Sequence, residues 1–251
     1  MSQRRPRISS RPSPRVVVLL ALVAVAVYLL TAYSHTSGDR SESPVVPATD
    51  TPTASPEPTR AAPPSATTAD TLAVLAGIPV KGRAPKTGYD REGMFGAAWV
   101  DVDRNGCDTR NDILARDLAD ETLSGTCRVM SGTLVDPYTT ATIAFVRGEH
   151  SSALVQIDHL VALSNAWQTG AQLLTPEQRV AFANDPANLL AVDGPANSAK
   201  GDGDAATWLP ANRGFWCAYV SRQIGVKAAY GLWVTAAEHD AMERVLESCP
   251  V

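Results

Sequence analysis

The sequence predicts a single α+β domain over residues 71–251, exported from the cytoplasm and held together by two disulfides. Strand-like and helix-like patterns are mixed along these residues without the regular strand–helix–strand alternation of a parallel sheet. All four cysteines lie in the same region, and a basic, an apolar and a proline-rich segment precede it in that order. This order of segments is typical of a protein that is inserted into or moved across a membrane.

The N-terminal segment indicates export. Residues 1–15 form a basic cytoplasmic region with five arginines, and residues 16–33 contain an uninterrupted apolar run from Val16 to Leu30. The run is at the short end of the roughly 20 residues that a membrane helix needs. Its small-residue cleavage site, at Ala32 and Ser34, is poor. We therefore expect a single-pass anchor in the cell membrane with the domain outside the cell, and the alternative is secretion after cleavage.

Residues 34–70 are predicted to be a disordered linker. They are rich in Pro, Ser, Thr and Ala and contain seven prolines. Such a segment has too little apolar surface to fold. It would act as an extended stalk between residues 16–33 and the domain of residues 71–251.

The cysteines favour disulfides over a metal site. An even number of cysteines in an exported protein is typical of disulfide pairing, which here allows three connectivities. Sequence neighbourhood favours pairing Cys107 with Cys127 and Cys217 with Cys249. A zinc site needs close pairs of ligands, and no two cysteines are nearer than twenty positions.

Hydrophobic spacing and turn residues predict the elements of the domain, after a short apolar element at residues 71–80. The turn DPYT, residues 136–139, predicts a hairpin between two of the strands. A cap at Asp108 or Thr109 is expected for the first helix. Strands are expected at residues 97–102, 127–134, 140–146, 154–159 and 189–192, and helices at residues 111–122, 160–172, 176–183, 212–224 and 236–247.

The charge of the domain excludes a broad basic surface for nucleic acid. From Gly88 onward, twelve Lys and Arg stand against twenty-one Asp and Glu, a net charge of −9. Nucleic-acid-binding surfaces usually carry an excess of basic residues. Any site that handles phosphate must therefore be local, and we expect it to be assisted by a metal ion.

The stretch DVDRNGCDTRND, residues 101–112, partly matches a calcium-binding loop. Asp101, Asp103 and Asn105 occupy the first, third and fifth positions of the template, and Asp112 occupies the twelfth. The twelfth position normally carries a bidentate glutamate, the seventh is here Cys107, and no clear helix precedes the loop. Ca²⁺ at Asp101, Asp103 and Asn105 is therefore the alternative, and the favoured interpretation is a strand end and a turn before a helix.

Two further stretches carry the strongest functional pattern. VQIDHLVALSNAW, residues 155–167, ends an apolar strand with the pair Asp158–His159. FANDPANL, residues 182–189, ends where a second strand begins, and NSAKGDGDAATWLP, residues 197–210, follows that strand. With CDTRNDIL, residues 107–114, this combination resembles the HNH endonucleases. More narrowly, residues 88–249 resemble exported actinobacterial proteins with the HNH domain also found at the C-terminus of GmrSD-type restriction endonucleases.

The resemblance implies a ββα-metal finger, in which two strands and a helix hold one divalent cation. It assigns Asp158 and Asn197 as metal ligands and Asn188 as the support of the loop that bears the histidine. Oxygen ligands with few protein contacts favour Mg²⁺ or Mn²⁺. His159 suits a general base, because imidazole titrates near neutral pH and can hold a water beside a phosphate.

Two cations are candidates for contact with phosphate. Lys200 follows Asn197 by three positions and so lies on the same helical face. Arg110 belongs to the segment that the resemblance places against the finger, where it could clamp a phosphate with two hydrogen bonds. His150 and His239 have no partners in the motif and are expected to be surface or structural residues.

These observations predict a metal-dependent HNH endonuclease, a monomer that hydrolyses phosphodiester bonds in nucleic acid with little sequence specificity. DNA outside the cell is favoured over RNA as the substrate. One alternative is an extracellular calcium-binding module centred on residues 101–112. Another is a nuclease fold without catalytic activity that serves as a binding domain.

Overall fold

The computed structural model describes residues 67–148 and 152–250, which belong to one compact unit. The predicted basic region, the apolar segment of residues 16–33 and nearly all of the predicted linker lie outside the described residues, as does His150. In the part of the chain that is described, no helix has the length and apolar character needed to cross a membrane.

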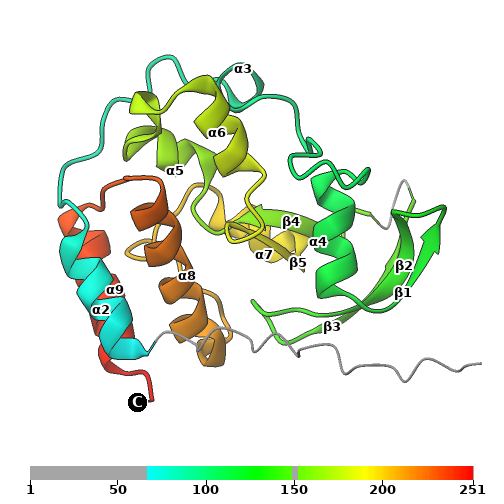
Figure 1. Cartoon of the computed structure of the whole chain (residues 1–251). Coiled ribbons are helices and arrows are strands. Elements are labelled where there is room, and N and C mark those ends of the chain that lie inside the picture. Colours follow the sequence, from blue (N-terminus) through cyan, green and yellow to red (C-terminus); the bar gives the residue numbers. More distant parts are fainter. Residues whose placement is uncertain (1–66, 149–151, 251) are drawn as a thin grey trace, which may run out of the picture. The chain divides into compact units, whose positions relative to one another are not determined.

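Helices and strands are mixed along the described residues, and the predicted α+β class is confirmed (Figure 1). The strands are β1 (Ala119–Ser124), β2 (Arg128–Val135), β3 (Thr142–Val146), β4 (Val155–His159) and β5 (Leu189–Asp193). The α-helices are α2 (Thr68–Gly77), α3 (Arg91–Phe95), α4 (Thr109–Asp117), α5 (Leu163–Gln168), α6 (Pro176–Ala183), α7 (Gly194–Lys200), α8 (Trp216–Ala229) and α9 (Ala236–Glu247). Short 3-10 turns, η1 (Ala171–Leu173) and η2 (Arg213–Phe215), precede α6 and α8.

The strands form two antiparallel sheets. β1, β2 and β3 pair in that order, and β2 and β3 form the hairpin predicted around residues 136–139. β4 pairs with β5, so that Asp158 lies opposite Leu190 and His159 opposite Leu189. α7 follows β5 directly and packs against both strands.

The β4–β5 pair separates two hydrophobic cores. On one face, Leu190 and Val192 pack with buried residues of α2, α8 and α9. On the other face, Leu189 and Ala191 pack with buried residues of α4, β2 and β3. Side chains alternate between the faces of a strand, so a slip of one residue would exchange the two sets. Burial on both faces therefore fixes the register at the end of β4.

Capping residues explain why α6 and α9 begin where the sequence predicts. Thr175 and Gln178 form a capping box at the start of α6, and Thr235 and Glu238 form one at the start of α9. In each box the two side chains bond the free backbone N–H groups of the first turn. Asp108 caps α4, accepting a hydrogen bond from the backbone N–H of Asn111.

The prediction of a strand at residues 97–102 is wrong, because this segment forms turns. Trp99 has a φ of 62°, which is incompatible with an extended strand. Side chains satisfy the backbone instead: Val100 N–H donates to Asn184 Oδ1 at 3.1 Å, and Thr109 Oγ1 donates to Val100 O at 2.5 Å. The segment therefore needs no partner strand.

Three predicted helix boundaries are also corrected. The helix expected at residues 111–122 ends at Asp117, and β1 follows it, exposed along its whole length. The helix expected at residues 160–172 is shortened to α5, because hydrogen bonds to Asn188 hold Leu160 and Val161 outside the helix. The helix expected at residues 212–224 is α8, which begins four residues later and ends five residues later than predicted, and η2 takes the place of its first turn.

The favoured disulfide pairing is confirmed. Cys107 is bonded to Cys127, and Cys217 is bonded to Cys249. The second bridge joins the start of α8 to the segment after α9, and it closes a loop with a sequence separation of 32. It therefore ties together the two helices that cover the C-terminal part of the domain.

Replacement of both Cys217 and Cys249 by serine is expected to lower the free energy of unfolding by roughly 3 to 4 kcal/mol. Without the bond the unfolded chain gains the conformational entropy that a closed loop of this length takes away. Urea unfolding of the oxidised protein measures the effect. The oxidised wild type is the reference, and the same protein treated with a reductant should lose at least as much stability. An unchanged midpoint in the double variant would show that the bridge adds nothing to the stability of the fold.

Candidate active site

Asp158 and His159 border the same pocket although they are neighbours on a strand. Adjacent residues of a strand point to opposite faces, so the pair can share a site only if the strand ends there. β4 does end at His159. The pocket has a volume of about 190 Å³, and its lining residues are Arg91, Ile157, Asp158, His159, Ala162, Leu163, Asn197 and Gly201.

Asn188 directs the chain after His159. It is fully buried, and its backbone oxygen accepts a hydrogen bond from Leu160 N–H at 2.8 Å. Its Oδ1 accepts from Val161 N–H at 2.8 Å, and its Nδ2 donates to Val161 O at 3.3 Å. The backbone of Asn188 thus bonds Leu160, and its side chain bonds both backbone groups of Val161. The support role that the resemblance implies for Asn188 stays a prediction.

Asp158 is buried and bonded through both of its oxygens. Its Oδ2 accepts from the Tyr138 hydroxyl at 2.5 Å, and its Oδ1 accepts from Lys200 Nζ at 3.0 Å. Burial raises the pKa of Asp158, while the charge of Lys200 and the bond from Tyr138 act in the opposite direction. The carboxylate is therefore held in one orientation at the edge of the pocket.

Lys200 lies inside the protein and not on its surface. Its side chain is fully buried, and Nζ donates to Asp158 and to His159 O at 2.8 Å. The sequence-based hypothesis of a direct contact with phosphate requires an exposed ammonium group. The structure brings Lys200 together with Asp158 and His159, but as a buried partner of the carboxylate.

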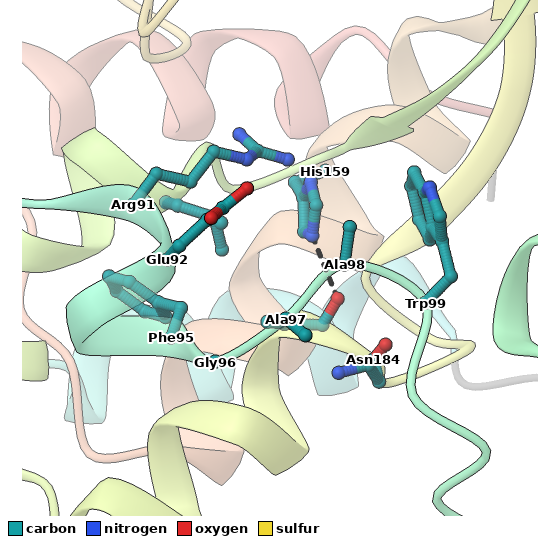
Figure 2. A pocket seen from close by; sticks show the side chains of 11 residues that line it. Arg91, Glu92, Phe95, Gly96, Ala97, Ala98, Trp99, His159 and Asn184 are labelled. Carbon is teal, nitrogen blue, oxygen red and sulfur yellow. Dashed lines mark hydrogen bonds between the residues drawn. The ribbon is translucent and has the colours of Figure 1, made fainter. Parts of the chain in front are cut away.

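The imidazole of His159 is held in one tautomer. Its Nε2 lies 2.8 Å from Ala183 O, and a carbonyl oxygen only accepts hydrogen bonds, so Nε2 carries the hydrogen (Figure 2). The Trp99 ring is stacked on the imidazole, with centroids 6.3 Å apart and planes inclined by 16°. Nδ1 of the neutral ring consequently keeps its lone pair as a proton acceptor.

Burial lowers the pKa of His159 from 6.5 to about 3; the bond to Ala183 opposes this shift, and the charges of Arg91 and Lys200 add to it. The imidazole is therefore neutral in the folded protein across the physiological pH range. A group whose pKa is lower in the folded state takes up a proton more readily when the chain unfolds. His159 therefore contributes stability that is fully present above pH 6.5 and is lost as the pH falls toward 3.

We expect the wild-type protein, in a chelating buffer, to lose roughly 2 to 3 kcal/mol more unfolding free energy between pH 7 and pH 4.5 than a His159→Gln variant loses. Urea unfolding at the two pH values measures this difference. The carboxylates that titrate in this range are common to both proteins, so their contributions cancel in the comparison. Equal losses in the two proteins would contradict a neutral, buried His159.

Asn197 lies on α7, the helix that packs against β4 and β5. Its Nδ2 donates to Gln156 Oε1 at 2.8 Å, which orients the amide. Asn197 and Asp158 both line the pocket and so offer it an amide and a carboxylate. Oxygen donors of this kind, few in number, fit a hard cation such as Mg²⁺ or Mn²⁺ that keeps several waters.

The structure does not bring Arg110 to this pocket. Its Nη2 donates to Val155 O at 3.3 Å, at the opposite end of β4 from His159. Burial is the main reason that its pKa is lowered, and the charge of Arg147 adds to the effect. The segment around Arg110 does lie against the β4–β5 pair, as the resemblance implies.

Three side chains around the site have no motif in the sequence to reveal them. Tyr138 belongs to the hairpin turn, which predicts only a change of chain direction. Trp99 and Arg91 reach the site from a segment that lies sixty or more positions before His159 in the chain. The only sequence signal was the turn motif that contains Tyr138. In the structure Asp136 of this turn is buried and accepts a hydrogen bond from Asp193 N–H at 2.9 Å. This bond ties the turn to β5 and so places Tyr138 against β4 and β5.

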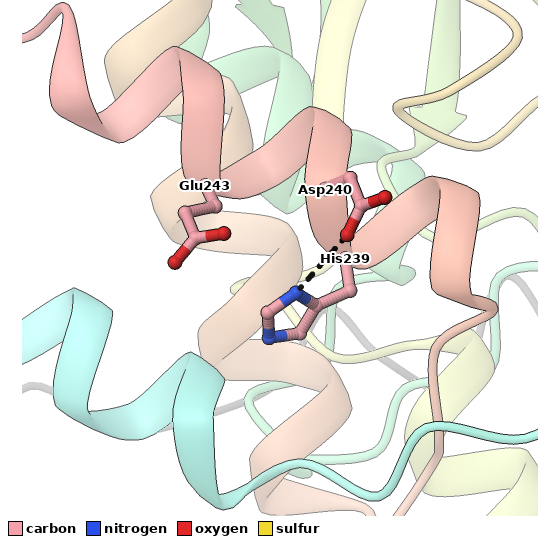
Figure 3. Close-up of side chains that lie close together, drawn as sticks. All are labelled: His239, Asp240 and Glu243. Carbon is pink, nitrogen blue, oxygen red and sulfur yellow. Dashed lines mark ion pairs between the residues drawn. The ribbon is translucent and has the colours of Figure 1, made fainter.

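Two other groups of polar residues lie outside the pocket. In the partial calcium-loop match, Asn105 Nδ2 donates to Asp103 Oδ2 at 3.1 Å and to Asp112 Oδ1 at 3.2 Å. On α9, ligand atoms of His239, Asp240 and Glu243 lie within 4.8 Å of one another (Figure 3). Neither group shares a residue with the pocket.

The described residues thus form an α+β domain with a buried carboxylate and a neutral histidine at the end of a strand in a two-stranded sheet. The family model described as "GmrSD restriction endonucleases, C-terminal domain" matches residues 108–245. The chain belongs to this family. The match includes all six residues predicted for the site, whereas Arg91 and Trp99 precede it.

A relative from Arthroderma benhamiae is 39% identical over 199 residues, covering 78% of this chain and 92% of its own length. That protein is described as an "Uncharacterized secreted protein". No solved structure matches the chain.

Proposed function

We propose that the protein is a metal-dependent endonuclease that hydrolyses phosphodiester bonds at the pocket bordered by Asp158, His159 and Asn197. The observation that carries the proposal is the fixed neutral imidazole beside a buried carboxylate. Membership of a family described by restriction endonucleases supports it. The succession β4, β5 and α7 also supports the ββα arrangement of the HNH endonucleases, with site residues at the strand end and on the helix.

In the proposed mechanism, Nδ1 of His159 accepts the proton of the attacking water. The bond to Ala183 and the stacked Trp99 hold the ring, so that no reorientation is needed when the water reacts. Burial disfavours the imidazolium that results, but the negative charge of a bound phosphate would offset this cost. Proton transfer by His159 is therefore favoured when the pocket contains substrate.

Asp158 and Asn197 would hold the metal ion, which would be Mg²⁺ or Mn²⁺. When bound, such an ion polarises the phosphoryl group and stabilises the leaving oxygen. Tyr138 and Lys200 keep the carboxylate of Asp158 oriented toward the pocket through their hydrogen bonds. Asn188 positions the chain after His159 and takes no part in the reaction itself.

The substrate is proposed to be DNA outside the cell, with RNA as the less favoured alternative. A domain that carries an excess of acidic residues repels the phosphate backbone, so binding is expected to be weak and to read little sequence. The secreted relative supports a location outside the cell. Whether the chain keeps residues 16–33 as a membrane anchor or loses them, the site would meet environmental DNA, and we propose that it acts as a monomer.

The substrate class can be tested by incubating the full chain with supercoiled plasmid and, separately, with single-stranded RNA. Each reaction is run with Mg²⁺, with Mn²⁺ and with a chelator. We expect metal-dependent nicking of the plasmid that exceeds the cleavage of RNA. If both substrates stay intact with every metal, the alternative of a nuclease fold used only for binding is favoured.

Calcium binding at Asp101, Asp103 and Asn105 is a second candidate function, because these side chains and Asp112 gather around one loop. Burial and then the nearby acidic groups raise the pKa of Asp112 despite the bond from Asn105. Ca²⁺ is expected to raise the melting temperature of the wild type and to leave that of Asp103→Ala unchanged. Equal shifts in the two proteins would remove this candidate.

A further inference from the structure

Arg91 stands at the entrance to the pocket although it is 67 positions before Asp158. It begins α3, whose Phe95 is buried against Trp167 and Phe182, with ring centroids 6.4 Å and 6.1 Å away. Arg179 Nε, on α6, donates to Met94 O at 2.8 Å. These contacts attach α3 firmly to α5 and α6, and so they fix the place from which Arg91 extends.

The backbone that follows α3 is also closely fitted. Gly96 has a φ of 79°, and a Cβ at this position would lie 2.9 Å from Val180 Cγ2. Only glycine combines this conformation with such a close approach to α6. The position of Arg91 relative to His159 is therefore built into the fold.

Arg91 borders both hollows that meet at His159. It lines the pocket with Asp158 and Asn197, and it also lines the small cavity between α3 and Trp99 (Figure 2). Among the described residues that line the first pocket, Arg91 is the single cation. Its side chain is exposed, and Figure 2 shows it reaching toward His159.

The two cations that the sequence predicts for phosphate are bonded to protein groups. Lys200 is fully buried and donates to Asp158 and His159 O, and Arg110 donates to Val155 O. Arg91, by contrast, has no carboxylate within 4.0 Å in the part of the chain that is described, and the hydroxyl of Tyr89 is its hydrogen-bonding neighbour. Its guanidinium is therefore available to an anion that enters the pocket.

We propose that Arg91 is the residue that binds the phosphate of the substrate, opposite His159. The inference rests on the proposed function and names the cation of that site. A guanidinium presents two parallel N–H donors, which match two oxygens of a phosphate. In a domain that is acidic as a whole, this arginine supplies the positive charge that draws the scissile phosphate toward His159.

The test measures the binding of a short fluorescent DNA duplex by anisotropy, in Mn²⁺ and at several salt concentrations. The full chain is used in a His159→Ala background, which is expected to slow turnover strongly. Arg91→Ala is expected to weaken binding by about tenfold to a hundredfold and to reduce the slope of log affinity against log salt by about 0.9. Arg91→Lys should keep the slope, because the charge remains, with an intermediate affinity. The matched control is Arg244→Ala, which removes an exposed arginine of α9.

The same substitutions are then placed in the chain with His159 intact, and plasmid nicking is measured. Slower nicking by Arg91→Ala than by Arg244→Ala is the expected result. If the wild type nicks plasmid and the two variants bind and cut alike, the assignment of Arg91 is overturned while the proposed function stands. A wild-type chain that neither binds nor cuts nucleic acid would overturn the proposed function and the role of Arg91 with it.

Discussion

Replacement of His159 by alanine is expected to lower the rate of metal-dependent nicking by a factor of about 100 to 10,000. General bases contribute rate factors of this size. The geometry leaves the variant without a substitute, because Ala183 O and the Trp99 ring hold one imidazole in one tautomer. The initial rate at which supercoiled plasmid becomes open circles, in saturating Mn²⁺, measures the effect.

The control for this variant is His239→Ala. His239 lies on α9, away from the lining of the pocket, and its nearest charged neighbour is Asp240 at 3.8 Å. It should cut plasmid at the wild-type rate. Thermal melting of both variants shows whether each is folded at the assay temperature. A folded His159→Ala protein with wild-type activity would remove His159 from the mechanism.

The largest effect on stability is expected at a buried ion pair between α8 and α9. Lys227 Nζ lies 2.8 Å from Glu238 Oε1, and both side chains are 1% exposed. The ammonium also donates to Trp233 O at 3.1 Å and to Asn165 Oδ1 at 3.3 Å. Lys227→Met leaves the carboxylate of Glu238 buried without its cation, which costs about 3 to 5 kcal/mol of unfolding free energy.

The double variant Lys227→Met with Glu238→Gln separates the pair from the general effect of changing the core. Glutamine keeps the hydrogen bond that Glu238 accepts at the start of α9 and removes the unpaired charge. The double variant is therefore expected to be more stable than Lys227→Met alone, as measured by urea unfolding at pH 7. If the change in unfolding free energy of the double variant equals the sum of the changes in the two single variants, the two groups are not coupled.

Sequence patterns predicted the parts of the fold that depend on local chemistry. The capping boxes set the starts of α6 and α9, and apolar residues buried on both faces of the sheet set β4 and β5. The family resemblance was needed to connect Asp158, Asn188 and Asn197, because these residues are separated along the chain. In the structure Asp158 and Asn197 line one pocket, and Asn188 bonds the chain after His159; their roles as metal ligands and as support stay predictions.

Long-range packing decided what sequence patterns could not. The segment of residues 97–102 looks like a strand, but the side chains of Asn184 and Thr109 satisfy its backbone and leave Trp99 on His159. The sequence predicts that Lys200 contacts phosphate, but the carboxylate of Asp158 holds it inside the protein. Arg91 has no local signal, because it reaches the pocket only through the packing of α3 on α5 and α6.

The metal requirement of Asn197→Ala tests the central claim most directly. Asn197 is half-buried and its amide bonds Gln156, so its removal disturbs the fold less than the loss of Asp158 would. The rate of plasmid nicking by the full chain is measured against Mn²⁺ concentration, beside Ser198→Ala on the same helix. Loss of a residue that only orients a metal ligand lowers metal affinity by about tenfold to a hundredfold. Asn197 is proposed as a ligand itself, so the half-maximal Mn²⁺ concentration of Asn197→Ala should rise by about tenfold or more. Ser198→Ala should match the wild type. Coincident curves for all three proteins, or nicking that persists in a chelator, would contradict a metal-dependent site at this pocket.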